Sequence, residues 1–83
     1  MRQAVANVIE QTLAPAVRAD GGEIDLLDVT DAGVVRVRFG KRWAGSPATT
    51  LACKYVIEAH LRRTVPGVVA VEATMDYPLP HRS

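Results

Sequence analysis

The chain has 83 residues and a formal net charge of +1. A charge this close to neutrality gives no electrostatic reason to bind nucleic acid or an anionic membrane, so neither is expected as a partner. A single cysteine excludes an internal disulfide and suits a reducing compartment. No apolar run is long enough to span a bilayer, and the opening MRQAVANVIEQ lacks the continuous apolar core of a signal peptide. We expect one small cytoplasmic domain.

The first predicted element is a helix that ends at ADGG, residues 19–22. Its apolar face follows helical spacing through Val5, Val8, Ile9, Thr12, Leu13 and Ala16. Pro15 lacks the N–H that a continuous helix would use, so a kink or a new short turn is expected there. Either Gly21 or Gly22 can take the left-handed conformation that often follows a helix.

A β-hairpin is predicted next. The segments EIDLLDVT and VVRVRF alternate apolar and polar residues, and TDAG between them is typical of a turn. Placing the apolar residues of both strands on one face sets the register. The expected pairs are Ile24–Phe39, Asp25–Arg38 and Leu26–Val37. The charged pair then lies on the opposite face, which we expect to be solvated.

A second helix should begin at Ser46 and Pro47, because serine is a good N-cap and proline fits the first helical position. Its predicted buried stripe is formed by Cys53, Ile57, Leu61 and Val65, widened by Leu51, Tyr55 and Val56. The residues expected to face water are Glu58, Arg62 and Arg63. Pro66 should end the helix at the residue before it.

The segment VVAVEAT is predicted to be a third strand, and the two prolines of DYPLPHRS exclude continuous sheet pairing. We therefore expect a domain over residues 1–75 and a proline-containing tail over residues 76–83. The order α-β-β-α(α)-β predicts an α+β fold, in which helices cover a small three-stranded sheet.

Several features occur in a particular order along residues 4–75. They are Asp20-Gly21-Gly22 after a proline, Gly40 after the second strand, a Ser/Thr-rich helix start after Pro47, and Val65-Pro66 before the last strand. In this order and spacing the chain resembles the C-terminal domain of NifU and the related Nfu proteins. The resemblance implies the same α+β fold and a connection with iron–sulfur cluster assembly.

The resemblance also implies where a cluster would bind. In the family a Cys-x-x-Cys pair precedes the proline that corresponds to Pro47, and two copies are thought to bridge one cluster through four thiolates. Here Trp43 and Ser46 stand at the two cysteine positions. We therefore expect no metal ligands and no bound cofactor. The protein would be an accessory or partner-binding module of cluster assembly, and the alternative is a cluster-free interaction domain unrelated to iron–sulfur chemistry.

Other residues suggest chemistry less strongly. Cys53 lies on an apolar stripe and is expected to pack in the core, although a thiol-based activity is a further hypothesis. His60 is expected to be a packed helical residue, and His81 falls in the tail. Asp20 and Glu23 flank a turn, where we expect them to cap backbone groups.

The sequence shows no nucleophile with a neighbouring base, since Ser46 has no histidine or lysine close to it in the chain. We expect no enzyme. Trp43, beside Lys41 and Arg42, could either pack over the following helix or anchor a protein partner, because tryptophan and arginine dominate many interfaces. Iron–sulfur assembly components are the partners that the resemblance implies, and without a bridging cluster we expect a monomer.

Overall fold

The computed structural model describes the backbone of residues 1–76 and the side chains of residues 1–74. In chain order the elements are α1 (Arg2–Val8), the π-helical turn η1 (Ile9–Leu13), α2 (Ala14–Ala19), β1 (Gly22–Val29), β2 (Val34–Lys41), the 3-10 turn η2 (Arg42–Ala44), α3 (Pro47–Thr64) and β3 (Ala70–Asp76). This order confirms the predicted α+β class.

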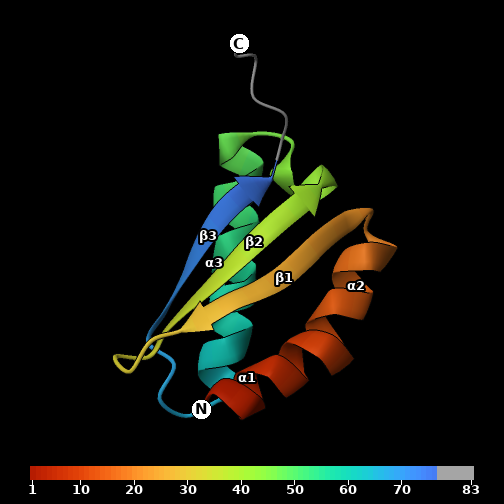
Figure 1. Ribbon diagram of the computed structural model, residues 1–83. Coiled ribbons are helices and arrows are strands. Elements are labelled where there is room, and N and C mark those ends of the chain that lie inside the picture. The colour runs from red at the N-terminus through yellow and green to blue at the C-terminus, as the bar shows by residue number, and fades with distance from the viewer. Residues whose placement is uncertain (77–83) are drawn as a thin grey trace.

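The three strands form one sheet in the order β1-β2-β3. β1 and β2 are antiparallel, whereas β2 and β3 are parallel and are joined by α3. In Figure 1 the sheet stands in front of α3, and the α1–α2 segment runs beside β1. One face of the sheet therefore meets the helices, and the other carries charged side chains.

The first helix changes its winding midway. The N–H of Ala14 donates to the carbonyl of Ile9, five residues back, which is the π pattern. The wider turn comes just before Pro15, whose ring would clash with the carbonyl four residues earlier in a regular helix. The extra residue shifts the buried face to Ala14 and Val17, so the prediction that Ala16 packs inward was wrong. Thr12, also predicted on the buried face, is exposed for the same reason.

The hairpin forms in the predicted register. All three expected pairs occur, namely Ile24–Phe39, Asp25–Arg38 and Leu26–Val37. Beyond Leu26 the register shifts, so Leu27 is an extra residue without a partner on β2 and is exposed. A bulge of this kind removes one residue from the alternation of the strand without disturbing the pairs before it.

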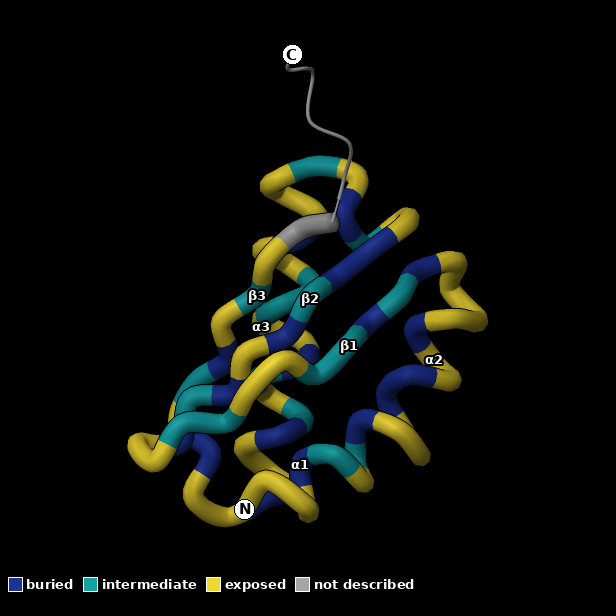
Figure 2. The backbone as a smooth tube through the Cα atoms, viewed as in Figure 1, coloured by how far each residue is buried: buried dark blue, intermediate teal, exposed yellow. Residues whose placement is uncertain are grey.

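The core lies between the sheet and the helices. Figure 2 shows buried positions along β2 and on the helical turns that face it. The largest fully buried side chains are Phe39, Ile57, Leu61, Val5, Val17, Val35, Val37 and Val71. They come from α1, α2, β2, α3 and β3, so every layer of the domain contributes to one hydrophobic cluster.

The second long helix begins and ends where the sequence predicted. Ser46 is its N-cap, and Val65, the residue before Pro66, has the extended conformation that ends it. The predicted buried stripe was wrong for Leu51, Tyr55 and Val56, which are 53%, 54% and 62% exposed. These residues point away from the side of α3 that carries Ile57 and Leu61.

The third strand includes Asp76, one residue past the predicted end of the domain. The rest of the predicted tail, residues 77–83, lies outside the described residues, and so does His81. Val71 of this strand pairs with Val35 of β2. The backbone N–H of Val71 donates a hydrogen bond to the side chain of Glu58 on α3.

Candidate functional site

The β2–α3 loop, residues 41–46, is the candidate site, because it holds Trp43 and Ser46, the two positions to which the sequence resemblance assigned the cluster ligands. Lys41 enters it with φ of 58°, a left-handed conformation that costs energy in a residue with a side chain. The N–H of Arg42 donates to the carbonyl of Gly21 at 3.2 Å. The hydroxyl of buried Thr50 donates to the carbonyl of Trp43 at 3.0 Å. These bonds attach the loop to the α2–β1 turn and to α3.

Trp43 is half-buried and packs on the hairpin. Its ring meets Phe39 edge to face, with ring centroids 5.4 Å apart and an interplanar angle of 77°. The indole Nε1–H donates to Asp20 Oδ2 at 2.9 Å. The ring also lies against Gly22, where a Cβ would come within 2.3 Å of Trp43 Cδ1. Only glycine fits there, so the second glycine of the Asp-Gly-Gly segment makes room for this tryptophan.

Ser46 is engaged at the start of α3. Its Oγ accepts the N–H of Thr49 at 3.1 Å and donates to the Thr49 hydroxyl at 3.0 Å. This is the N-cap that the sequence predicted. The oxygen at this position therefore serves the helix start.

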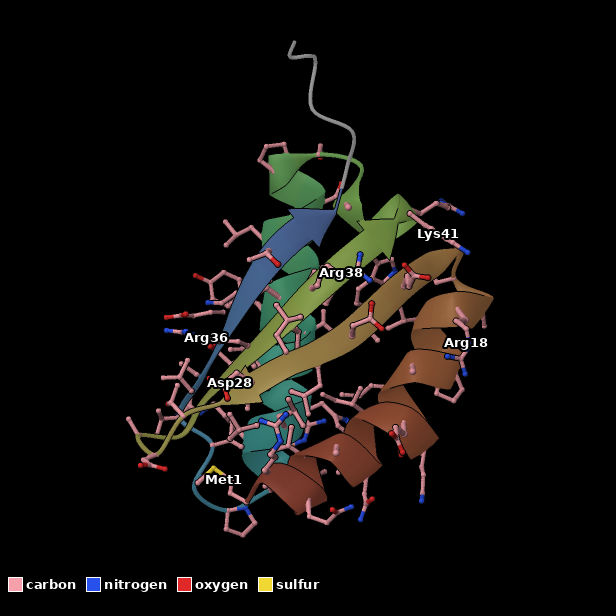
Figure 3. All side chains as sticks on the ribbon, viewed as in Figure 1. Met1, Arg18, Asp28, Arg36, Arg38 and Lys41 are labelled. Carbon is pink, nitrogen blue, oxygen red and sulfur yellow. The ribbon has the colours of Figure 1, made fainter. Side chains whose placement is uncertain are left out.

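Lys41 and Arg42 are both exposed. Figure 3 shows Lys41 projecting from the end of β2, away from the sheet. Among the residues whose side chains are described, neither forms an ion pair. The loop thus turns its tryptophan and serine inward and presents its positive charges to solvent.

Cys53 is half-buried on α3 and packs against the core cluster. Burial raises the pKa of its thiol, and the negative charge of Asp20 raises the pKa further. Cys53 is therefore held as a neutral thiol at neutral pH, whereas nucleophilic and metal-binding cysteines are thiolates.

Within the described residues, the two acidic residues beside the helix–strand turn do not cap backbone groups, contrary to our prediction. Asp20 accepts the indole N–H of Trp43, and Glu23 pairs with Arg38 at 3.9 Å. Arg38 also pairs with its predicted cross-strand partner Asp25. Arg38 thus forms ion pairs with Glu23 and Asp25 on the face of the sheet that is not covered by helices.

The described part of the chain contains no cluster of side chains that could bind a metal ion. His60 is half-buried on α3, and residues 1–74 contain no group of three or more His, Cys, Asp or Glu side chains that could hold a metal ion. The two positions singled out from the sequence, Trp43 and Ser46, lie in one loop. The indole of Trp43 is hydrogen-bonded to Asp20, and the hydroxyl of Ser46 accepts the N–H of Thr49.

Sequence reasoning missed Glu58, which was expected to face water. Its side chain is only 16% exposed and lies 3.6 Å from Lys54 Nζ. Glu58 Oε2 also accepts the backbone N–H of Val71 at 3.0 Å, which joins α3 to β3. The signal in the sequence was the spacing of Lys54 and Glu58, four residues apart, but that spacing cannot show which way the pair turns.

The fold is a small α+β domain in which the connection between β2 and α3 contains the 3-10 turn η2. The model of the NifU-like domain family matches residues 5–72, and the chain belongs to this family. Within residues 1–76, no helix is both long and apolar enough to cross a membrane.

Named relatives agree with this assignment. The Fe/S biogenesis protein NfuA of Stenotrophomonas maltophilia (strain K279a) is 34% identical over 74 residues, which are 89% of this chain and 37% of the relative. NfuA of Xanthomonas oryzae pv. oryzae (strain PXO99A) is 34% identical over 77 residues, covering 93% and 39%. NifU-like protein 2, chloroplastic, of Arabidopsis thaliana is 33% identical over 72 residues, covering 87% and 30%. The chain thus spans well under half the length of these relatives.

Proposed function

We propose that this chain acts in iron–sulfur cluster assembly as an accessory, partner-binding module that neither carries a cluster on its own ligands nor catalyses a reaction. Support for the assembly role comes from the family and from relatives named as Fe/S biogenesis proteins. The proposal places the protein in the cytoplasm, where a single free cysteine is suited to a reducing environment.

The observation that carries the proposal is the use of Trp43 and Ser46 inside the fold. By resemblance these are the positions of the two cluster thiolates. An indole whose N–H is bonded to Asp20 and a hydroxyl that caps α3 offer no thiolate to iron. Two copies of the chain would add only two Cys53 thiols, each held neutral, whereas the usual clusters take four thiolates. The residues present do not fit a bridged cluster.

The loop's outward side supports the partner-binding part of the proposal. Lys41 and Arg42 are exposed, and the strained backbone of Lys41 fixes the direction in which the loop leaves β2. Together with the exposed part of Trp43, these residues would form the contact with an assembly protein, and the chain would work as a monomer.

Anaerobic reconstitution with iron and sulfide tests the absence of a cluster. We expect a colourless protein without stoichiometric iron, measured by visible absorption and iron analysis. A stable brown dimer with about two irons or more would contradict the proposal. The double variant Trp43→Cys with Ser46→Cys serves as a comparison. We expect it to be colourless or unfolded, because it loses the contacts of Trp43 with Phe39 and Asp20. A folded, coloured double variant would show that the loop is a dormant cluster site.

The neighbourhood of the gene tests the assembly role. Adjacent genes for iron–sulfur assembly proteins would favour it. A neighbourhood without them would favour the alternative, a cluster-free interaction domain outside iron–sulfur metabolism.

A further inference from the structure

The outward side of α3 is apolar over about three turns. This α3 outer face is formed by Ala48, Leu51, Ala52, Tyr55, Val56 and Ala59, all of them exposed. The three largest, Leu51, Tyr55 and Val56, are more than half exposed. The outward side of a helix on a globular domain usually carries charged and polar residues. A continuous apolar strip there indicates a contact surface.

The charged side chains of α3 beside the α3 outer face are cationic. Lys54 Nζ lies 4.3 Å from the centre of the Tyr55 ring. Arg62 and Arg63 follow the α3 outer face at the end of the helix and are exposed, and neither forms an ion pair within the described part of the chain. The one acidic residue of α3, Glu58, turns inward to the N–H of Val71 and to Lys54. On α3 itself, a partner would therefore meet an apolar strip with a positive end and no outward-facing carboxylate.

This charge pattern argues against a second copy of the chain as the partner. In an antiparallel two-fold pair of α3 helices, Arg62 and Arg63 would face the partner's helix start, which is the positive end of the helix dipole. In a parallel pair the four arginines would face one another. Both arrangements place like charges together, and α3 offers no outward-facing carboxylate to separate them.

The shape of the face argues against a lipid surface. Surfaces that insert into a bilayer place long apolar and aromatic side chains forward. Here three of the six residues are alanines, Ala48, Ala52 and Ala59, which leave the helix backbone close to the surface. Small residues at this spacing let another helix approach closely, and its larger side chains could fill the space beside Leu51 and Tyr55.

We propose that the α3 outer face docks an amphipathic helix of a protein partner, with an apolar contact strip and carboxylates opposite Arg62 and Arg63. The mode is a helix laid along a helix face, in which apolar burial supplies affinity and the arginine–carboxylate pairs set the orientation. This surface is distinct from the β2–α3 loop, and the inference does not depend on a role in iron–sulfur assembly.

Two synthetic 18-residue peptides test the inference. Both peptides carry the same contact strip of alanine and leucine. In the acidic peptide the remaining positions are glutamate and glutamine, and in the basic peptide they are lysine and glutamine. Each is titrated into the ¹⁵N-labelled full chain. We expect the acidic peptide to shift amide resonances along Leu51–Arg63 and to bind at least about tenfold more tightly than the basic peptide.

Variants of the full chain sharpen the assignment. Val56→Glu should weaken the acidic peptide by about tenfold or more, because it places a carboxylate in the apolar strip. Arg62→Glu with Arg63→Glu should reverse the preference between the two peptides. Thr12→Glu, at an exposed position on η1, is the matched control and should leave binding unchanged. Circular dichroism checks that each variant is folded.

Several results would overturn the inference. They are equal affinity for the two peptides, absence of binding, and resonance shifts confined to other elements. A concentration-dependent dimer in sedimentation that Val56→Glu abolishes would identify a second copy as the partner instead. Binding of phosphatidylglycerol vesicles through the same residues would identify a lipid surface. None of these measurements uses iron, so failure here leaves the proposed assembly role untouched, and the reverse also holds.

Discussion

The β2–α3 loop and the α3 outer face use their side chains in opposite ways. In the loop, Trp43 and Ser46 occupy positions that resemblance assigns to a metal site, yet both are bonded within the fold. On the outer face, Leu51, Tyr55 and Val56 were expected to be buried but are more than half exposed. The comparison teaches that a side chain at a position expected to be functional can be used by the fold, whereas apolar side chains expected in the core can remain largely exposed.

The largest effect is expected at Trp43. Trp43→Ala should lower the free energy of unfolding by about 3 kcal/mol, the lower part of the range for large aromatic residues, because the ring is only half-buried. Urea unfolding followed by circular dichroism measures this, since the variant has lost its only tryptophan. Trp43→Phe keeps a ring against Phe39 but loses the bond to Asp20, and should cost about 1 kcal/mol. If Trp43→Ala is as stable as the native chain, the loop is not structural.

Glu58 tests whether the polar side of α3 is truly turned inward. Glu58→Ala should cost about 2 kcal/mol, because it leaves the buried N–H of Val71 without its acceptor. Glu72→Ala is the matched control, since that carboxylate is 62% exposed in a surface pair with Arg36 and should cost under about 0.5 kcal/mol. Equal losses in thermal or urea unfolding would mean that Glu58 is solvated like Glu72.

The helix cap should show a moderate effect. Ser46→Ala should lower stability by about 1 kcal/mol, because the N–H of Thr49 loses its acceptor. Ser46→Asp retains an acceptor and a favourable charge at the helix start, so it should stay close to the native value. An alanine variant with unchanged stability would remove the structural explanation for this position and reopen a role in binding.

The smallest effects are expected on the α3 outer face. Tyr55→Ala and Val56→Ala should each change the free energy of unfolding by less than about 0.5 kcal/mol, because both residues are more than half exposed. Alanine also favours the helical conformation over valine, which offsets part of any loss at position 56. Losses of about 2 kcal/mol or more would show that these residues support the fold after all, and the contrast with the loop would disappear.

Local sequence signals determined much of the fold. The strict alternation through Val35, Val37 and Phe39 fixed the hairpin register, because a slip of one residue would turn every apolar side chain to solvent. Ser46 and Pro47 fixed the start of α3, and Pro66 fixed its end. The ordered glycines and prolines also indicated the NifU-like family, which the family match confirms.

Only the tertiary structure decided how those elements are used. Apolar residues occupy more than one side of α3, so spacing could not distinguish Ile57, which is buried, from Val56, which is exposed. The π turn before Pro15 moved the inner face of the first helix by one residue, an effect that an ideal helical period cannot contain. Two partners of Trp43, Asp20 and Gly22, are more than 20 residues away in the chain and are brought to it only by folding. A linear sequence specifies local conformation through backbone preferences, whereas the burial of one face over another depends on which surfaces meet in space.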